Sequence, residues 1–381
     1  MFKDTVEFIR QLYQTAEFIP LHEPRFSGNE RAYVMDAIDS TFVSSVGAYV
    51  DRFENEFAAY TGAKFAIATV NGTAALHIAL KLADVQPGDE VITQPLTFIA
   101  TCNAISYCQA TPVFIDVDRE TMGLSPEKLE QWLQDNCRSD EQGCVNLSTG
   151  RIVRACVPMH TFGHPADIEG LARVCERYGI TLVEDAAESL GSFVGDRHSG
   201  NFGKVAAFSF NGNKTITTGG GGMITTDDPS LAARAKHLTT TAKVPHKWAY
   251  AHDEIGFNYR LPNLNAALGC AQLEQLPGYI ERKRWLASQY QTFFETQGIA
   301  FKVERSGTHS NYWLNALVLE SAEQRDQFLG ISNAAGVMTR PIWQLMSRLP
   351  MFADCQHGDL ENALWLEQRV VNIPSSVILE G

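Results

Sequence analysis

Residues 65–83, FAIATVNGTAALHIALKLA, join a short β-rich run to a helical stretch through Asn71 and Gly72. The same alternation of apolar runs and helical stretches continues as far as residue 226. The predicted strands cover residues 65–70, 90–94, 111–117, 152–159, 180–185, 205–210 and 221–226, and the predicted helices cover residues 72–83, 97–108 and 167–179. This alternation predicts an α/β fold with a mainly parallel sheet and helices on both of its faces. Ligands bind to such sheets beyond the carboxyl ends of the strands, so functional residues are expected there.

The composition is typical of a globular protein. Hydrophobic residues make up 45% of the 381 residues and charged residues 20%, which excludes a disordered chain. The net charge of −13 argues against a nucleic-acid-binding surface, which needs a basic stripe. We find no secretory signal and no run of about 18 apolar residues, so we expect a cytoplasmic protein with no membrane span. The eight cysteines form no C-x-x-C pair, which predicts buried free thiols and no metal site.

The sequence pattern changes near residue 262. A long helical pattern begins there, and a strand at residues 312–320 and a helix at residues 321–336 follow it. A chain of this length exceeds the size at which one core usually stops growing. We therefore predict a large domain over residues 1–262, with an N-terminal helical extension, and a smaller α+β domain over residues 263–381 that includes an interdomain helix. Residues 135–151 are polar and turn-rich, which predicts a surface loop.

The first predicted strand is followed by a candidate phosphate-binding segment. Asn71, Gly72 and Thr73 open the next helix, and we expect Thr73 to cap it. A helix N-terminus presents unpaired N–H groups and a partial positive charge, which suit a phosphate. Gly72 would let the anion approach the backbone. Helix capping without any ligand explains the same residues.

Two charged residues follow later predicted strands. The strand at residues 180–185 ends in Asp185, which could hold a cation such as a protonated ring nitrogen or could cap a helix. Lys214 follows the strand at residues 205–210 and precedes four glycines at residues 219–222. A lysine in an enclosed site can form a Schiff base with a carbonyl, although most lysines are solvated surface charges. A P-loop does not fit, because its glycines precede the lysine.

These three features together supply the contacts that pyridoxal phosphate needs. The helix N-terminus suits the phosphate, Asp185 suits the pyridinium and Lys214 suits the aldehyde. We interpret the glycine run as a turn without side chains that leaves room for the cofactor or for the facing backbone. On this hypothesis, valine at Gly220 or Gly221 impairs cofactor binding.

From about Ile19 to Gly381 the chain resembles the DegT/DnrJ/StrS family of pyridoxal-phosphate-dependent sugar aminotransferases. The resemblance rests on five segments in the family's order: VNGTAALHIAL, QPLTFIATCNAI, VEDAAESLGS, FSFNGNKTITTGGGGMI and GFNYRLPNLNAALGCAQL. It implies the aspartate-aminotransferase-type fold (fold type I), pyridoxal phosphate as cofactor and a homodimer with shared active sites. The segments STFVSSVG, VPMHTFGHP and RPIWQLMSRLPMF resemble the branch that acts on UDP-linked 4-keto-6-deoxy-N-acetylhexosamines for legionaminic acid or bacillosamine synthesis.

The resemblance implies a role for each matching residue. Lys214 matches the Schiff-base lysine, and Asp185 matches the aspartate that keeps the pyridine nitrogen protonated. The other cofactor residues that match are Gly72, Thr73, Ala74 and Ser209 at the phosphate, Phe98 stacked on the ring and Asn258, which reaches the phosphate across a dimer interface. Ordinary helix packing also explains Phe98. Glu188 departs from the family, which often has Gln or His beside the ring hydroxyl. A carboxylate there repels a phenolate unless one of the two carries a proton.

The implied reaction is transamination from L-glutamate to C4 of a nucleotide-linked 4-keto-6-deoxy sugar. The candidate substrate residues are Ser44, Ser45, Arg260 and Arg340, with Arg260 also a second candidate for the phosphate. His160 either touches the sugar or is a buried structural histidine. One alternative is a pyridoxamine-dependent dehydratase of the same family, in which histidine replaces the lysine, and Lys214 argues against it. The other is a non-catalytic regulatory protein on the same fold, and Lys214 and Asp185 argue against that.

Overall fold

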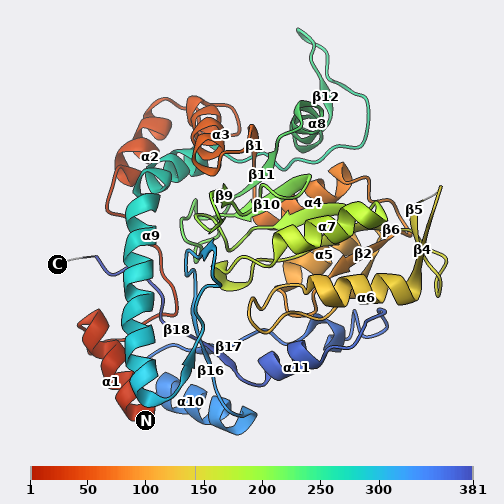
Figure 1. Ribbon diagram of the computed structural model, residues 1–381. Coiled ribbons are helices and arrows are strands. Elements are labelled where there is room, and N and C mark those ends of the chain that lie inside the picture. The colour runs from red at the N-terminus through yellow and green to blue at the C-terminus, as the bar shows by residue number, and fades with distance from the viewer. Residues whose placement is uncertain (1, 142, 380–381) are drawn as a thin grey trace.

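A seven-stranded mixed sheet forms the centre of the molecule (Figure 1), as a computed structural model of the chain shows for residues 2–141 and 143–379. Its strands, in spatial order, are β1 (Phe65–Thr69), β11 (Gly222–Thr226), β10 (Val205–Ser209), β7 (Thr181–Asp185), β6 (Val153–Val157), β2 (Glu90–Thr93) and β3 (Thr111–Phe114). Strand β11 runs antiparallel to both of its neighbours, and the other pairs are parallel. The predicted mainly parallel sheet is therefore confirmed.

Helices cover both faces of this sheet, as the sequence predicts. One face is covered by α4 (Gly72–Leu82), α5 (Ile99–Tyr107) and α8 (Pro229–Thr239), and the other by α3 (Ala48–Thr61), α6 (Pro126–Asn136), α7 (Ile168–Tyr178) and the first part of α9 (Asn263–Gln297). Successive side chains of a strand point to opposite faces. In β1, Ala66 and Ala68 accordingly face Phe53 and Phe57 of α3, whereas Ile67 faces α4.

Helix α9 connects this sheet to a second, smaller layer. Its 35 residues extend for about 50 Å, from α2 (Glu30–Asp39) to the C-terminal layer (Figure 1). That layer is a four-stranded antiparallel sheet packed against α10 (Ala322–Ala334), and its strands in spatial order are β14 (Ala300–Phe301), β16 (Asn315–Val318), β18 (Val370–Ile373) and β17 (Arg340–Pro341). Helix α9 thus connects the seven-stranded sheet to a C-terminal layer of strands and a helix.

The N-terminal helix packs differently from the prediction. Helix α1 (Phe2–Tyr13) was assigned to the large domain, but it packs against the C-terminal layer, with the ring of Phe2 5.2 Å from that of Phe328. Its buried residues Phe2, Val6 and Ile9 share a hydrophobic cluster with α9, α10, β16 and β18. The division of the chain at residue 262 stays a prediction.

Shorter elements complete the described chain. They are β4 (Cys137–Asp140) with β5 (Gly143–Asn146), β8 (Phe193–Val194) with β9 (Arg197–His198) and β15 (Thr308–His309), β12 (Lys243–Val244) with β13 (Ala251–His252), α11 (Glu361–Glu367) and the 3₁₀ turns η1 (Thr161–Gly163) and η2 (Met346–Arg348). The predicted surface loop at residues 135–151 contains the β4–β5 hairpin. All eight cysteines are free thiols. Among the described helices, none is long and apolar enough to cross a bilayer.

The topology brings three chain segments to one edge of the sheet. Strand β7 ends at Asp185, β10 ends at Ser209, and α4 begins at Gly72 just beyond the end of β1. Thr69 of β1 and Ser209 of β10 both pair with Gly222 of β11, so these strand ends lie side by side. The predicted cofactor residues therefore converge from distant parts of the sequence.

Replacing Phe57 should test the aromatic layer beneath β10. Phe57 is fully buried, and its ring packs edge-on against Phe208 and Phe210. We expect Phe57→Ala to lower the free energy of unfolding by about 3–5 kcal/mol, measured by urea titration of the cofactor-free protein. The matched control is Phe18→Ala, because Phe18 is 62% exposed, and it should shift stability by no more than about 0.5 kcal/mol. Equal losses in the two variants would contradict this description of the core.

Candidate active site

Lys214 lies between a carboxylate and an aromatic ring. Its Nζ is 3.2 Å from Oε1 of Glu188 and 3.9 Å from the centroid of the Trp313 ring. The side chain is 13% exposed, so the amine is largely enclosed but still reachable. The loop after β10 therefore holds the lysine in a largely enclosed position, as suits a Schiff-base lysine.

Asp185 is a buried carboxylate at the end of β7. Its Oδ2 accepts a hydrogen bond from Thr101 Oγ1 at 2.7 Å, and its Oδ1 accepts one from the Ala187 N–H at 3.2 Å. Burial raises the pKa of Asp185, and the hydrogen bonds and the charge of Lys214 oppose that rise. A cation placed against this carboxylate would compensate the buried charge. The geometry suits the predicted pyridinium partner.

Glu188 shares the same enclosure. Its Oε2 accepts a hydrogen bond from the Phe162 N–H at 2.9 Å, and its Oε1 faces Lys214. Burial raises the pKa of Glu188, Lys214 and Phe162 lower it, and the charge of Asp185 raises it further. A raised pKa favours the protonated carboxyl. The protonated carboxyl would not repel the cofactor's phenolate oxygen. This resolves the difficulty that the sequence raised for a glutamate at position 188.

The N-terminus of α4 is capped by Asn71 rather than by Thr73, which corrects the prediction. Asn71 Oδ1 accepts a hydrogen bond from the Ala74 N–H at 2.7 Å, so this N–H is already used within the protein. The N–H groups of Gly72 and Thr73 have no acceptor among the described hydrogen bonds. Of the three predicted phosphate-binding N–H groups, the structure therefore leaves those of Gly72 and Thr73 available to an anion.

Gly72 and Ser209 form a narrow cradle at this helix end. A Cβ added to Gly72 would lie 2.7 Å from the Ser209 Cβ, closer than side chains tolerate. The Ser209 hydroxyl, which accepts a 3.4 Å hydrogen bond from the Asn211 N–H, is partly exposed at this position. The missing side chain at residue 72 thus lets the serine hydroxyl lie beside the free N–H groups.

The four glycines after Lys214 have different structural roles. Gly219 has a φ of +79°, which favours glycine. A Cβ at Gly220 would meet only the Val70 oxygen at 3.9 Å, whereas one at Gly221 would lie 2.2 Å from Thr218 Oγ1. A Cβ at Gly222 would lie 2.5 Å from the Asn71 backbone oxygen. The structure therefore has room for a Cβ at residue 220. The positions at which a Cβ would clash with neighbouring atoms are Gly221 and Gly222.

Three more predicted residues border this region. Phe98 precedes α5 and is 50% exposed, with its ring 6.5 Å from that of Trp343, so it is not an ordinary core residue. Arg260 forms a β-bridge with Thr69 at the end of β1, and its buried Nε has no hydrogen-bond partner among the described residues. Asn258 is exposed two residues earlier. Both Asn258 and Arg260 therefore lie on the segment that runs along the end of β1.

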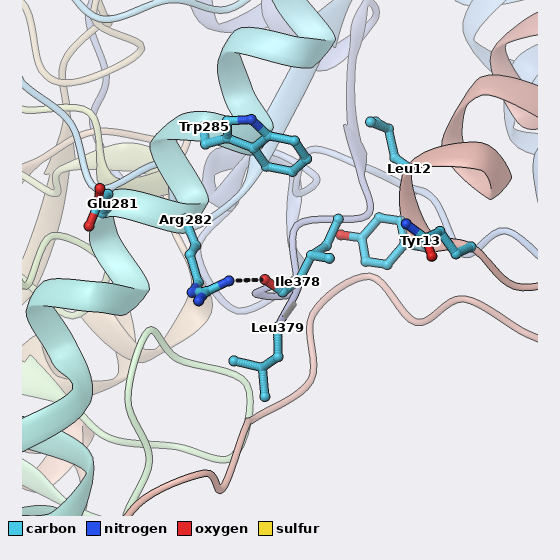
Figure 2. A pocket seen from close by; sticks show the side chains of 8 residues that line it. Leu12, Tyr13, Glu281, Arg282, Trp285, Ile378 and Leu379 are labelled. Carbon is cyan, nitrogen blue, oxygen red and sulfur yellow. Dashed lines mark hydrogen bonds between the residues drawn. The ribbon is translucent and has the colours of Figure 1, made fainter. Parts of the chain in front are cut away.

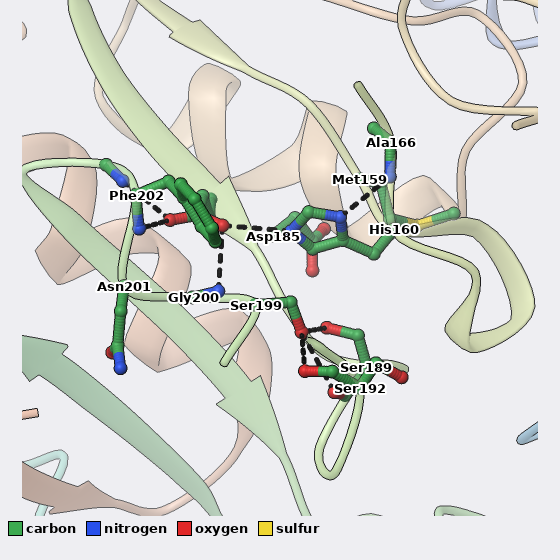
Figure 3. Close-up of polar contacts among 12 residues, drawn as sticks. Met159, His160, Ala166, Asp185, Ser189, Ser192, Ser199, Gly200, Asn201 and Phe202 are labelled. Atoms are coloured by element: carbon green, nitrogen blue, oxygen red, sulfur yellow. Dashed lines mark hydrogen bonds and ion pairs between the residues drawn. The ribbon is translucent and has the colours of Figure 1, made fainter. Parts of the chain in front are cut away.

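His160 is a buried structural histidine, which decides between the two alternatives left by the sequence. Its Nε2 is 3.0 Å from Glu184 Oε2, and its Nδ1 accepts a hydrogen bond from the Ala166 N–H at 3.1 Å (Figure 3). Burial raises the pKa of Glu184, but His160 and the N–H groups of Gly203 and Gly200 bring it below its ordinary value. With both ring nitrogens bonded and no exposed surface, His160 cannot touch a sugar in this conformation.

The structure does not join the remaining substrate candidates to Lys214. Ser44 and Ser45 lie in a loop held on the start of α9, where the Ser44 carbonyl oxygen accepts a 2.6 Å hydrogen bond from the Asn263 N–H. Arg340 is exposed on β17 and donates to Asn333 Oδ1 at 3.2 Å and to the Thr339 carbonyl oxygen at 3.0 Å. Among the described residues, none of these three side chains makes a hydrogen bond, ion pair or ring contact with the lysine, so their roles stay predictions.

Sequence reasoning missed three contacts of the site. Trp313 lies against Lys214 although 99 residues (313 − 214) separate them, and nothing local in the sequence signals that contact. Thr101 reaches Asp185 from α5, and its place in the helix after the predicted strand at residues 90–94 is a signal that could have found it. Asn71 is itself a strong helix-capping residue and could have been chosen over Thr73.

A separate cavity of about 580 Å³ lies between α1, α9 and the C-terminal segment (Figure 2). Arg282 donates a hydrogen bond to the Ile378 carbonyl oxygen there at 3.2 Å, and Trp285 and Tyr13 also line it. Its lining includes none of the residues predicted to bind cofactor or substrate. The chemistry-bearing residues therefore gather at the sheet edge and not in this cavity.

Comparison with known proteins identifies the family of this chain. The profile of the DegT/DnrJ/EryC1/StrS aminotransferase family matches residues 24–381. GDP-perosamine synthases of Escherichia coli O157:H7 and Caulobacter vibrioides are 36% identical over 361 residues and 37% identical over 362 residues, and each alignment covers 94% of this chain and 93% of the relative. The crystal structure of the aminotransferase TlmJ from Streptoalloteichus hindustanus is 26% identical, with a TM-score of 0.86 over 95% of both chains.

The glycine that adjoins the cradle gives a direct test. Alanine at Gly222 would push against the Asn71 backbone and displace the start of α4, so we expect Gly222→Ala to weaken pyridoxal phosphate binding about tenfold or more, about 1.4 kcal/mol. The matched control is Gly220→Ala, whose Cβ has space and whose binding should stay near that of the wild type. Binding is measured by titrating the cofactor-free protein and recording visible absorbance. Comparable affinities for both variants would contradict this description of the glycine run.

The proton on Glu188 can be tested by pH. As the pH rises through the raised pKa of Glu188, the carboxyl loses its proton and begins to repel the cofactor's phenolate oxygen. We therefore expect pyridoxal phosphate affinity to fall with rising pH more steeply in the wild type than in Glu188→Gln, which cannot ionise. Dissociation constants measured across pH for both proteins give the comparison. Identical pH dependences would show that Glu188 carries no such proton.

Proposed function

Because this chain belongs to the DegT/DnrJ/EryC1/StrS aminotransferase family, we propose that it transfers an amino group from L-glutamate to C4 of a nucleotide-linked 4-keto-6-deoxy sugar. The family establishes the coarser activity: the chain is a sugar aminotransferase that uses pyridoxal phosphate. The observation that supports amino-group transfer at this site is the enclosed amine of Lys214, which lies beside Glu188 in the same site as the buried carboxylate of Asp185.

The residues present fit pyridoxal phosphate. The cradle between Gly72 and Ser209, which a Cβ would fill, lies at a helix N-terminus with two free N–H groups. Ser209 and Gly72 would hold the phosphate, Asp185 the ring nitrogen and Lys214 the aldehyde carbon. Phe98 would lie against the ring face, and its exposed side chain is free to do so. When bound, the cofactor supplies an electron sink for the carbon that loses or gains a proton.

Lys214, Glu188 and Asp185 would have different roles in the reaction. Lys214 moves a proton to and from the reacting carbon, and Glu188 at 3.2 Å holds the free amine in place between transfers. Thr101 and Ala187 orient the two oxygens of Asp185, whose carboxylate would be stabilised in its charged form by a cationic ring nitrogen placed against it. The enclosure leaves the lysine 13% exposed, which limits the access of water.

The acceptor sugar that we propose is derived from the sequence resemblance. The segments STFVSSVG, VPMHTFGHP and RPIWQLMSRLPMF resemble the branch that uses UDP-linked N-acetylhexosamines for legionaminic acid or bacillosamine synthesis, and we propose such a UDP-sugar as the acceptor. The names of two relatives refer instead to GDP-perosamine. A GDP-linked sugar is therefore the second candidate acceptor.

We further propose that the enzyme works as a cytoplasmic homodimer with shared active sites. The segment around β12 and β13 protrudes from the sheet (Figure 1) and exposes Trp248 at 80% and Tyr250 at 84%. Exposed aromatic residues of this size are typical of a protein–protein interface. Asn258 follows this segment and is exposed in the single chain, as a residue that reaches a partner's phosphate would be.

The decisive experiment replaces the lysine and varies the sugar. Reduction of the holoenzyme with borohydride should label Lys214, and Lys214→Ala should lose about 100-fold to 10,000-fold of the transamination rate. The control Lys204→Ala, which changes an exposed lysine, should keep full activity. Rates with glutamate and UDP-, GDP- and dTDP-linked 4-keto sugars then identify the acceptor. Labelling of another lysine, or no turnover of any 4-keto sugar, would overturn the proposal.

A further inference from the structure

A buried lysine that the reaction scheme does not use lies behind the active site. Lys283 of α9 is fully buried, and its Nζ donates to the carbonyl oxygens of Ser375 at 2.6 Å and Trp313 at 3.1 Å. Its third neighbour is His22 Nε2 at 3.0 Å. Burial lowers the pKa of Lys283 to about 7, and it lowers that of His22 well below its ordinary value. Burying an amine is costly, so this arrangement needs a structural explanation.

The segment that Lys283 holds carries the ring beneath Lys214. The backbone N–H of Trp313 donates to Asn311 Oδ1 at 2.7 Å, and its indole Nε1 donates to the Asn213 carbonyl oxygen at 2.7 Å. Together with the bond from Lys283, three separate hydrogen bonds fix this one residue. Asn213 directly precedes Lys214, so the indole is bonded to the backbone of the loop that presents the lysine.

Both contacts of the lysine amine belong to the same framework. Asn311 Nδ2 donates to the Glu188 carbonyl oxygen at 2.8 Å and lies 3.4 Å from Thr215 Oγ1. The Asn311 side chain therefore links the backbone of Glu188 to the backbone of Trp313. The position of the Trp313 ring relative to Glu188 is set by the buried residues Asn311 and Lys283 and by the backbone of the loop that carries Lys214.

We propose that Trp313 is a positioning residue for Lys214, that its indole face receives the free amine between the steps of the reaction, and that Lys283 is the anchor that fixes this ring. The inference rests on the proposed role of Lys214. An ammonium group over an indole face is attracted by the ring's quadrupole, most strongly where water is excluded. Glu188 on one side and Trp313 on the other restrict the rotation of the lysine side chain, so the amine returns to the same position after each transfer.

The first test uses the cofactor-free protein. We would measure the rate at which an amine-selective acylating reagent modifies Lys214 at fixed pH, by mass spectrometry of the peptide. Removal of the ring in Trp313→Leu uncovers the amine and removes one of its two contacts, so modification should accelerate about fivefold. Trp313→Phe keeps a ring but loses the bond to Asn213 and should give a smaller change. Lys283→Met should also accelerate the modification of Lys214, as Trp313→Leu does.

Matched variants separate positioning from loss of packing. Lys302→Met removes another buried lysine, which donates to the Glu120 carbonyl oxygen, and Trp365→Leu removes another partly buried indole. Both should leave the modification rate of Lys214 and the activity unchanged. Unchanged modification in Trp313→Leu, or an equal effect of Lys302→Met and Lys283→Met, would overturn the inference.

A second readout uses the holoenzyme and keeps the two proposals distinct. In Trp313→Leu, kcat for the reaction with glutamate should fall about tenfold with little change in KM, because the ring acts through its contact with the lysine. An equal rise in KM with kcat intact would contradict a positioning role. If borohydride labels a lysine other than Lys214, the proposed function fails. If it labels Lys214 while Trp313→Leu behaves as the wild type in both assays, only this inference fails.

Discussion

The hydrogen bond from Lys214 to Glu188 imposes a constraint that the surrounding helices and strands must satisfy. Glu188 and Asp185 are both buried, and a buried carboxylate destabilises the fold unless it is paired and hydrogen-bonded. The partners come from distant segments: Thr101 from α5, the Phe162 N–H from η1 and Lys214 from the loop after β10. The polar contacts of the site therefore also link α5, η1 and the loop after β10 to the end of the sheet.

The sequence was sufficient for those parts of the site that depend on local pattern and sheet topology. Asp185 ends one predicted strand, Ser209 lies one residue before the end of another, and Gly72 opens the helix predicted after a third. In a mainly parallel sheet such ends meet at one edge, so their convergence follows without knowledge of any side-chain contact. Lys214 could be placed there for the same reason, because it follows β10 closely.

The parts that failed depend on long-range or conformational detail. Trp313 reaches Lys214 through a framework of buried hydrogen bonds that no sequence spacing reveals. His160 has the same sequence context whether it faces a ligand or the core, and only its bonds to Glu184 and Ala166 decide. The packing of α1 on the C-terminal layer could not be predicted because an amphipathic helix specifies a buried face but not its partner.

Helix α9 makes two sets of hydrogen bonds that hold other segments of the chain in place. Its first residue, Asn263, accepts a hydrogen bond from the Tyr49 N–H and donates to the Phe42 carbonyl oxygen, whereas Lys283 binds the Trp313 segment 20 residues later (283 − 263). Deleting one residue between them would rotate one of these two residues by about 100° relative to the other. The number of residues in this stretch is thus constrained independently of their identity, a limit on insertions and deletions that the turn at residues 147–150 does not share.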